Sequence, residues 1–476
     1  MSEIRYMPIR VLVLAALMLM AALLPAAPAG ASTTQASILQ DDPHLIYTTT
    51  SANREKRLDE LQSLGIDIVK VRVNWRVLAP SRRPSGYNGA DPTAYGDRWT
   101  PYDELVAGAE ARGLGVLFQV GGSAPEWATP GNSAIRNPNP AEFGKFVEAV
   151  GARYPSVHMY SVWNEPNLVS WLSPQVSGGV PQSPRIYRGL LSAAAGGLQR
   201  SGHTSDQLLV GELLPFSRSS NDSTKKIRPI AFLRELACVD SHYKPYGGNA
   251  ARKRGCKGFK SLPGTGLAYH PYTLSGGPKV KTPNKDDASI GDLGRLNSAI
   301  NKLRARHRIG SYWPIWITEF GFQSDPPDPY GSPIKKIPAY MGEAEYLAFK
   351  NSRVRSFAQY PLIDDQGHVA GFQSGLRFSN GKPKPYVFAA FQRPFFARQL
   401  GSRVELFGGV RAASSGSVTI QTRTSTKAKW STLRDASLNT RGYFDVIVKV
   451  SKISKRYFRF IGSGQPASRT AKAVKR

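Results

Sequence analysis

Cysteine and histidine are scarce in this chain. Its 476 residues include two cysteines and seven histidines. Two cysteines are too few for a zinc-finger array or a small disulfide-rich scaffold. The histidines form no H-E-x-x-H motif and no Cys/His cluster, so we expect no catalytic metal and no other cofactor.

Acidic residues are few relative to basic ones. The chain has 63 Lys and Arg against 34 Asp and Glu, which gives a formal net charge of +29. No helix-turn-helix, zinc finger or aromatic RNP motif accompanies this charge, so we do not expect nucleic-acid binding. The charge indicates attraction to an anionic cell-wall polymer or an acidic polysaccharide, or else an Arg-rich composition without a partner.

Long apolar runs are limited to one, near the start of the chain. Val11 to Leu24 are all apolar, Arg5 and Arg10 precede them, and the small residues 29–31 follow. These 14 residues fall short of the roughly 18 to 20 that span a bilayer. We expect residues 1–31 to be a cleaved signal peptide and the mature protein to be extracellular, without an integral membrane segment.

Export would place the two cysteines in an oxidising compartment. Cys238 and Cys256 are separated by 17 residues. In an oxidising compartment such a pair is expected to form a disulfide, which closes a surface loop and contributes about 3 kcal/mol. The alternative is two unrelated buried thiols.

Hydrophobic residues, 41% of the chain, are sufficient for a large core and exclude a disordered protein. From Asp41 to Phe395, short β-branched apolar runs alternate with longer amphipathic stretches. The expected strands are Leu45–Thr49, Ile66–Val73, Gly115–Val120, Met159–Trp163, Leu208–Glu212, Gly266–His270, Ile315–Thr318 and Val354–Tyr360. The expected helices are Ala52–Leu64, Pro101–Arg112, Pro140–Arg153, Ser183–Gln199, Ile227–Ala237, Asp292–Ile309, Pro338–Ser352 and Pro385–Phe395.

This alternation predicts an α/β protein with a (β/α)8 TIM barrel over residues 41–395, because the barrel is built from eight such strand and helix pairs. The rival fold, a doubly wound open sheet, is disfavoured because the glycine motif G-x-G-x-x-G is absent after the first expected strand.

The composition changes after about Leu400. Short pieces there alternate apolar with polar residues and show no helical period, which predicts a small antiparallel β-sandwich over residues 400–467. From Leu400 onward there are 16 Lys or Arg and three Asp or Glu. We expect residues 468–476 to be a disordered basic tail. We also expect this domain to supply attachment through charge while the barrel holds all the chemistry.

Two glutamates come just after expected strands, each within a short motif. Glu165 follows the fourth strand within Trp163-Asn164-Glu165-Pro166, and Glu319 follows the seventh within Thr318-Glu319-Phe320-Gly321. The carboxyl ends of barrel strands face the active-site mouth, so two such carboxylates can point across one cleft. Paired carboxylates about 5 to 5.5 Å apart are what glycosidic bond cleavage with retained configuration requires. The alternative, a merely solvated strand-end Glu, is less favoured for two such residues without a nearby cation in the sequence.

Trp163–Pro166 and Ile317–Gly321 resemble the acid/base and nucleophile motifs of clan A retaining β-glycoside hydrolases, a barrel group that includes the family 5 cellulases and family 39 enzymes. The resemblance covers about Asp41 to Phe395. It implies an enzyme that cleaves O-glycosidic bonds of a poly- or oligosaccharide by double displacement, and the expected signal peptide makes this enzyme a secreted one. Glu165 would be the general acid/base and Glu319 the nucleophile.

The resemblance also implies roles for four further residues. Asn164 would donate a hydrogen bond to the sugar 2-hydroxyl, and Arg72 would steady the nucleophile. Within Tyr269-His270-Pro271-Tyr272, Tyr272 would lie near the nucleophile and His270 would line the sugar site.

Four tryptophans fall at or just after expected strand ends, namely Trp75, Trp127, Trp163 and Trp171. Indole faces there either stack on sugar rings or pack the barrel mouth, and we expect sugar contacts from Trp75 and Trp127.

The chain departs from the family 5 pattern in two places. The third-strand His has no counterpart near Gln119, and the eighth-strand Trp is missing, so that Gln359, Tyr360 or Trp127 would take its place. These departures put the sugar preference in doubt. The alternative function is a catalytically inactive glycan-binding surface protein on the same barrel.

Overall fold

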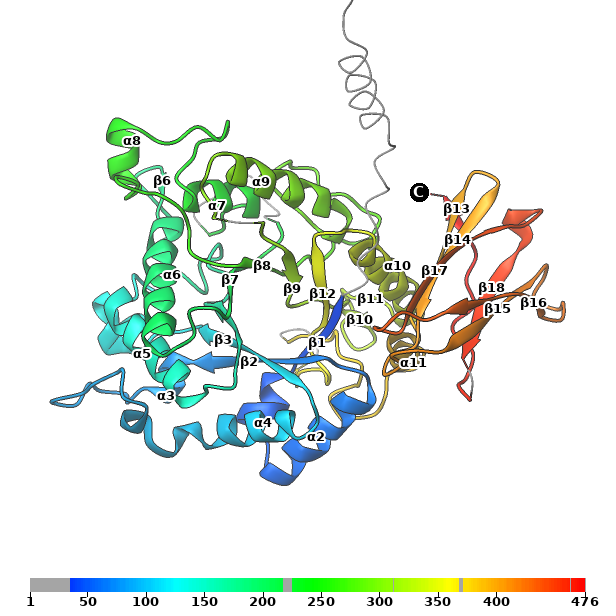
Figure 1. The fold of residues 1–476 in the computed structure, drawn as a ribbon, viewed down its shortest axis with the longest axis horizontal. Helices are drawn as coiled ribbons and strands as arrows, with labels where there is room; N and C mark the ends of the chain where they lie inside the picture. Colours follow the sequence, from blue (N-terminus) through cyan, green and yellow to red (C-terminus); the bar gives the residue numbers. More distant parts are fainter. Residues whose placement is uncertain (1–34, 217–224, 311, 368–370, 463, 476) are drawn as a thin grey trace, which may run out of the picture.

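The computed structural model describes residues 35–216, 225–310, 312–367, 371–462 and 464–475. The expected signal peptide lies outside these residues. Eight parallel strands close into a barrel with helices around it (Figure 1), which confirms the (β/α)8 prediction. In spatial order the barrel strands are β1 (Ala36–Gln40), β12 (Val354–Gln359), β9 (Ile315–Ile317), β8 (Gly266–Tyr269), β7 (Gln207–Leu213), β4 (Met159–Val162), β3 (Gly115–Gly121) and β2 (Ile68–Asn74).

Each helix expected from the sequence overlaps an observed one. The observed helices are α2 (Ser51–Ser63), α3 (Trp75–Leu78), α4 (Thr100–Glu110), α5 (Pro140–Arg153), α6 (Ser183–Arg200), α7 (Pro229–Leu236), α8 (Gly248–Lys253), α9 (Leu293–Ala305), α10 (Ile337–Phe349) and α11 (Val387–Gln392). Helix α5 shows which local features start such a helix. The Asn139 side chain accepts the backbone N–H groups of Ala141 and Glu142, and Pro140 occupies the first turn. The helix then buries Phe143 and Phe146 against the barrel.

The first barrel strand corrects the sequence analysis. It is Ala36–Gln40, whereas residues 45–49 were expected to form it. Residues 43–47 instead form a single π-helical turn, whose start is favoured by the fixed φ of Pro43. Leu45 and Ile46 are buried from this turn, which accounts for their apolar character.

The C-terminal part is an antiparallel β-sandwich, as predicted. One sheet has the order β17 (Tyr443–Lys449), β14 (Arg403–Gly409), β13 (Phe395–Leu400) and β19 (Val474–Lys475). The other has the order β16 (Ser431–Ser437), β15 (Ser417–Arg423) and β18 (Tyr457–Gly462). Two-stranded pairs elsewhere in the chain join β5 (Val176–Ser177) to β6 (Val180–Pro181) and β10 (Ser324–Asp325) to β11 (Ser332–Pro333).

Both ends of the sandwich differ from expectation. It begins with β13 at Phe395 rather than at Leu400, because this strand pairs with β14 through its whole length. The expected disordered tail is ordered over residues 468–475. Val474 pairs with Arg398, and Phe458 and Ala471 exchange backbone hydrogen bonds of 2.8 and 2.9 Å.

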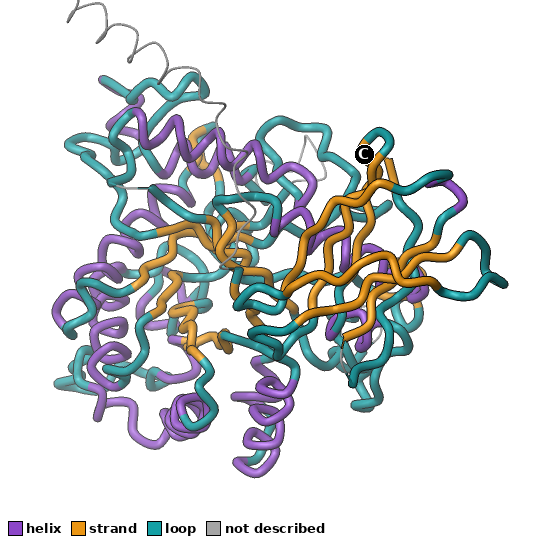
Figure 2. Tube along the Cα trace, turned by 45° about the vertical axis from the view of Figure 1, so that its right-hand side comes forward, coloured by secondary structure: helices purple, strands orange, loops and turns teal. Residues whose placement is uncertain are grey.

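The sandwich packs on helix α10 of the barrel (Figures 1 and 2). Tyr346 and Phe349 of α10 form an aromatic cluster with Phe396, Phe407 and Tyr443 of the sandwich. A buried ion pair lies beside this cluster. Glu345 of α10 accepts hydrogen bonds from Arg411 (2.7 Å) and from the Tyr443 hydroxyl (2.5 Å).

The expected disulfide is present. The Cys238 and Cys256 sulfurs are 2.08 Å apart, and the bridge closes the segment that carries α8. Among the residues that the structure describes, no helix has the length and apolar character needed to cross a membrane.

Candidate active site

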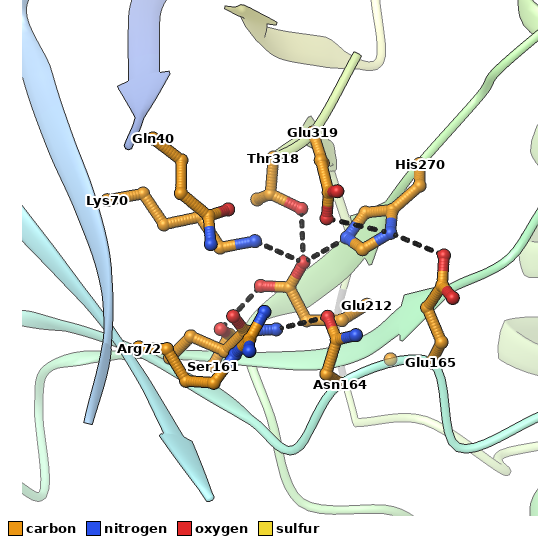
Figure 3. Close-up of polar contacts among 12 residues, drawn as sticks. Gln40, Lys70, Arg72, Ser161, Asn164, Glu165, Glu212, His270, Thr318 and Glu319 are labelled. Atoms are coloured by element: carbon orange, nitrogen blue, oxygen red, sulfur yellow. Dashed lines mark hydrogen bonds and ion pairs between the residues drawn. The ribbon is translucent and has the colours of Figure 1, made fainter. Parts of the chain in front are cut away.

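Glu165 and Glu319 meet at the carboxyl end of the barrel, where they follow β4 and β9 (Figure 3). Both contact the same ring nitrogen of His270. Nδ1 lies 3.1 Å from Glu165 Oε1 and 3.2 Å from Glu319 Oε2. The distance between the two carboxylate oxygens therefore cannot exceed the sum of these two distances.

His270 lies beneath the two glutamates rather than along a sugar site. Its side chain has 0% exposure, and Nε2 is 2.6 Å from Glu212 Oε2. Burial by itself lowers the pKa of His270, but the charge of Glu319 and hydrogen bonds with Glu165 and Glu212 raise it to about 9. The ring is thus an imidazolium at neutral pH and donates from both nitrogens. The expectation that His270 lines the sugar site is corrected accordingly.

Glu212, at the end of β7, is a residue that the sequence analysis did not place in the site. It is fully buried and paired with the equally buried Lys70 of β2, with Nζ 2.9 Å from Oε2. The hydroxyls of Ser161 (2.5 Å) and Thr318 (2.6 Å) also donate to it. Burial alone raises the pKa of Glu212, but Lys70 and His270 hold it well below its ordinary range. The signals in the sequence were a third strand-end Glu and a lysine inside the apolar strand β2.

The Asn164 amide is held in one orientation. Gln119 Nε2 donates to Asn164 Oδ1 (2.7 Å) and to the carbonyl of Trp163 (3.0 Å). Figure 3 shows the Asn164 amide nitrogen on the side toward Glu165. Gln119 lies on the third barrel strand, where the family 5 pattern has a histidine, and it orients Asn164 as a donor toward the cleft.

Tyr272 lies against the expected nucleophile. Its hydroxyl donates to Glu319 Oε1 at 3.0 Å, and its ring stacks on Phe320. Burial and the charge of Glu319 raise the pKa of Tyr272 well above its ordinary value, so the phenol stays a neutral donor.

Arg72 lies in the site but makes a different contact from the expected one. Its guanidinium carbon is 4.7 Å from the centroid of the Trp171 ring. Within the described part of the chain, no hydrogen bond or ion pair joins Arg72 to Glu319, and Arg72 Nε is buried without a partner. Burial lowers the pKa of Arg72, while the charges of Asp42 and Glu319 raise it above its ordinary value. Arg72 thus acts on Glu319 through its charge alone.

The two tryptophans expected to contact sugar differ in burial, since Trp75 lies in the core and Trp127 is partly exposed. Trp75 is 1% exposed and stacks on Phe146 in the core, so its expected role as a sugar platform is wrong. Trp127 packs edge-on against Trp75 and Tyr87, and its Nε1 donates to the Pro80 carbonyl. The indole beside the site residues is Trp171, through its contact with Arg72.

The backbone around the glutamates is strained. Trp163, Glu165 and Glu212 have φ angles of 67°, 35° and 56°, in the left-handed region that non-glycine residues rarely adopt. The Glu165 N–H donates to the Glu212 carbonyl at 3.0 Å, so two of these strained residues hold each other. This backbone hydrogen bond thereby fixes the positions from which the Glu165 and Glu212 carboxylates project.

One group of described residues has the composition of a metal site, at the opposite end of the barrel. His158 and Asp206 precede β4 and β7, and His203 Nδ1 lies 2.6 Å from Asp206 Oδ2. The other His203 nitrogen faces the Gly151 carbonyl at 3.0 Å. The group is far from Glu165 in the fold, because it lies at the amino ends of these strands.

No protein-family model matches this chain, and no curated protein is similar to it in sequence. Solved structures that are similar to this chain include a GH30 endoxylanase from Clostridium papyrosolvens C71, at 11% identity over 92% of this chain and 98% of that one, with a TM-score of 0.44. The family 1 β-glucosidase from Thermotoga maritima is 13% identical over 77% of this chain and 97% of that one, with a TM-score of 0.44. The GH30 subfamily 8 xylanase Xyn30A from Clostridium acetobutylicum is 12% identical over 91% and 97%, with a TM-score of 0.45. Because these sequence identities are so low, the chemistry of the site follows from its own geometry.

Proposed function

We propose that this protein is a retaining β-glycoside hydrolase. The observation that carries the proposal is the contact of Glu165 and Glu319 with one nitrogen of His270. These contacts keep the two carboxylate oxygens closer together than the carboxylates of inverting enzymes, which are about 6.5 to 9.5 Å apart. They permit the separation of about 5 to 5.5 Å found in retaining enzymes. A gap of this size leaves no room for a water between a carboxylate and the sugar, so direct attack by one carboxylate is favoured.

The contacts of the two glutamates favour a division of roles. His270 contacts both carboxylates, so the difference between them is the Tyr272 hydroxyl, which donates a hydrogen bond to Glu319 and stabilises it as the ionised carboxylate that attacks the anomeric carbon. Glu165 then protonates the departing oxygen and later removes a proton from the incoming water. The Asn164 amide would hold the sugar 2-hydroxyl during both steps.

We also propose that the protein is exported through residues 1–31 and acts on a poly- or oligosaccharide outside the cell. Edman sequencing of mature protein recovered from the culture medium would then begin at Ser32.

The high positive charge of the sandwich supports a second proposal, attachment of the enzyme to an anionic polymer.

Hydrolysis of a panel of aryl β-glycosides, followed by proton NMR, tests the main proposal. We expect turnover of at least one member, with the β-anomer appearing first. An α-anomer as first product would contradict retention. Sugar binding by isothermal calorimetry without turnover of any glycoside or polysaccharide would favour the inactive glycan-binding alternative.

A further inference from the structure

The three-stranded sheet of the sandwich, β16-β15-β18, lies on the side away from the barrel (Figure 1). Its strands alternate in burial. Ile420, Phe458 and Phe460 are buried in the sandwich core. Arg423 pairs with Tyr457 and Gln421 with Arg459 in the same register, so these four side chains share the outer face.

A cluster of cations and aromatic rings occupies this outer face. The guanidinium carbons of Arg423 and Arg459 lie 4.4 and 4.2 Å from the Trp430 ring centroid. Arg423 is also 5.7 Å from the Tyr457 ring, and Lys472 Nζ is 4.7 Å from that ring. We call these five residues the basic aromatic cluster.

The cations of this cluster have no carboxylate partner within the part of the chain that the structure describes. Arg459 Nε donates to Gln421 (2.8 Å), and Arg423 Nε is buried without a partner. Asp435, the carboxylate of the outer sheet, accepts the Thr419 hydroxyl.

The remaining acids of the sandwich are engaged at the barrel. Glu405 and Asp445 each lie 2.9 Å from Lys350 Nζ, which follows α10. Three sandwich cations form ion pairs in the described residues. Arg411 and Arg441 reach carboxylates of the barrel, and Arg398 lies 3.7 Å from Glu405 of its own sheet. The outer sheet is therefore left with positive charge that the protein itself does not neutralise.

Two like charges held against one indole repel each other. Burial and the neighbouring charge of Arg423 lower the pKa of Arg459, as expected when one cation disfavours the charged form of another. An anionic ligand that contacts both guanidinium groups would remove the repulsion. Arginine presents its N–H groups as a planar fork that matches a carboxylate, and the Trp430 and Tyr457 rings hold these cations in place on the outer face.

We propose that the basic aromatic cluster is a binding site for a carboxylate-bearing polysaccharide, with Arg423 and Arg459 pairing with uronate groups. This inference deepens the polymer attachment proposed above and rests on it. Single-stranded nucleic acid also combines anionic groups with rings that stack, but the proposed glycosidase site of the same chain favours a glycan.

The test uses the full chain and polygalacturonate as the probe, with binding measured by affinity electrophoresis at about 0.15 M salt, where charges beyond ~8 Å are screened. The double variant R423K/R459K keeps both charges but loses the planar forks, and we expect at least a tenfold weaker affinity. R423Q/R459Q should weaken binding further. The matched control R403Q/K449Q removes two exposed charges that face each other on β14 and β17, and should change affinity less than twofold.

Two results would overturn the proposal. One is an equal loss of affinity in R423Q/R459Q and in the R403Q/K449Q control, because binding would then follow net charge rather than the cluster. The other is tighter binding of a single-stranded DNA oligonucleotide than of polygalacturonate by the wild-type chain. Turnover of a small aryl glycoside by each variant reports separately on the barrel, so failure of the hydrolase proposal would not be mistaken for failure of this one.

Discussion

His270 joins the two proposed catalytic glutamates through one nitrogen and Glu212 through the other. Its pKa rises from an ordinary 6.5 to about 9, so the folded state binds this proton more tightly than the unfolded state. The stabilisation is complete below about pH 6.5 and is lost as the pH rises through about 9. We expect the free energy of unfolding in urea to fall between about pH 7 and about pH 9.5.

The H270Q variant provides the control for this pH dependence. It has no proton to lose in that interval, so its free energy of unfolding should change less than that of the wild type. An identical decline in both proteins would show that other groups cause it.

Glu212 is the anion that balances Lys70 and His270 in the barrel interior. E212Q would leave Lys70 buried without an opposite charge, and we expect a loss of about 3 to 5 kcal/mol in the free energy of unfolding. His270 would also lose a partner of its charged form, so the alkaline limb of the kcat/KM profile should move to lower pH.

The double variant K70M/E212Q restores charge balance and should recover much of the stability that E212Q loses. Wild-type stability together with a wild-type pH profile in E212Q would contradict this account of the buried network.

At the scale of elements, the turn after β3 makes room for Arg72. Gly122 has φ of +101°, and a Cβ there would lie 2.9 Å from Arg72 Cδ. G122A should therefore displace Arg72 and reduce kcat/KM by roughly tenfold or more, in line with the cost of small misplacements in active sites. G113A, before β3, is the matched control, because its φ is +67° and nothing lies within 4 Å of the added carbon. Equal activity in the two variants would contradict the steric argument.

Local patterns were sufficient to predict most elements of the barrel. Glu165 and Glu319 were found because each ends a short apolar strand and is followed by Pro166 or by a glycine turn. Strand β1 was missed because Ala36–Gln40 shows no apolar and polar alternation, while residues 45–49 offer an equally apolar run nearby.

Other features of the site depend on contacts that no local pattern encodes. Lys70 and Glu212 lie 142 residues apart and meet only when the barrel closes. The burial of Trp75 depends on Phe143 and Phe146 of α5, so its place at a strand end could not distinguish a core residue from a sugar platform.

At the scale of the whole molecule, the sandwich is a support for the barrel as well as a charged surface. Glu345 of α10 is buried, and its partners Arg411 and Tyr443 belong to the sandwich. These contacts predict that truncation at Leu400 destabilises the barrel, although the barrel holds the proposed chemistry. We expect the truncated chain to lose at least about 3 to 5 kcal/mol, the cost of breaking one buried pair, and to lose turnover of an aryl glycoside as it unfolds.

Thermal unfolding of the full and truncated chains measures this effect. The R423Q/R459Q variant, which alters only the outer sheet, should keep the melting temperature of the full chain. A truncated chain with wild-type melting temperature and turnover would show that the sandwich is not a support.

The roles of the two glutamates are tested most directly by azide rescue of their alanine variants on an activated aryl β-glycoside, with the configuration of the glycosyl azide determined by NMR. E319A lacks the nucleophile, so azide would attack from that side and give inverted product. E165A should still form the covalent intermediate, because an activated leaving group needs little protonation, and azide should then release it with retained configuration. Products of the same configuration from both variants, or no rescue of either in an otherwise active enzyme, would contradict the assignment.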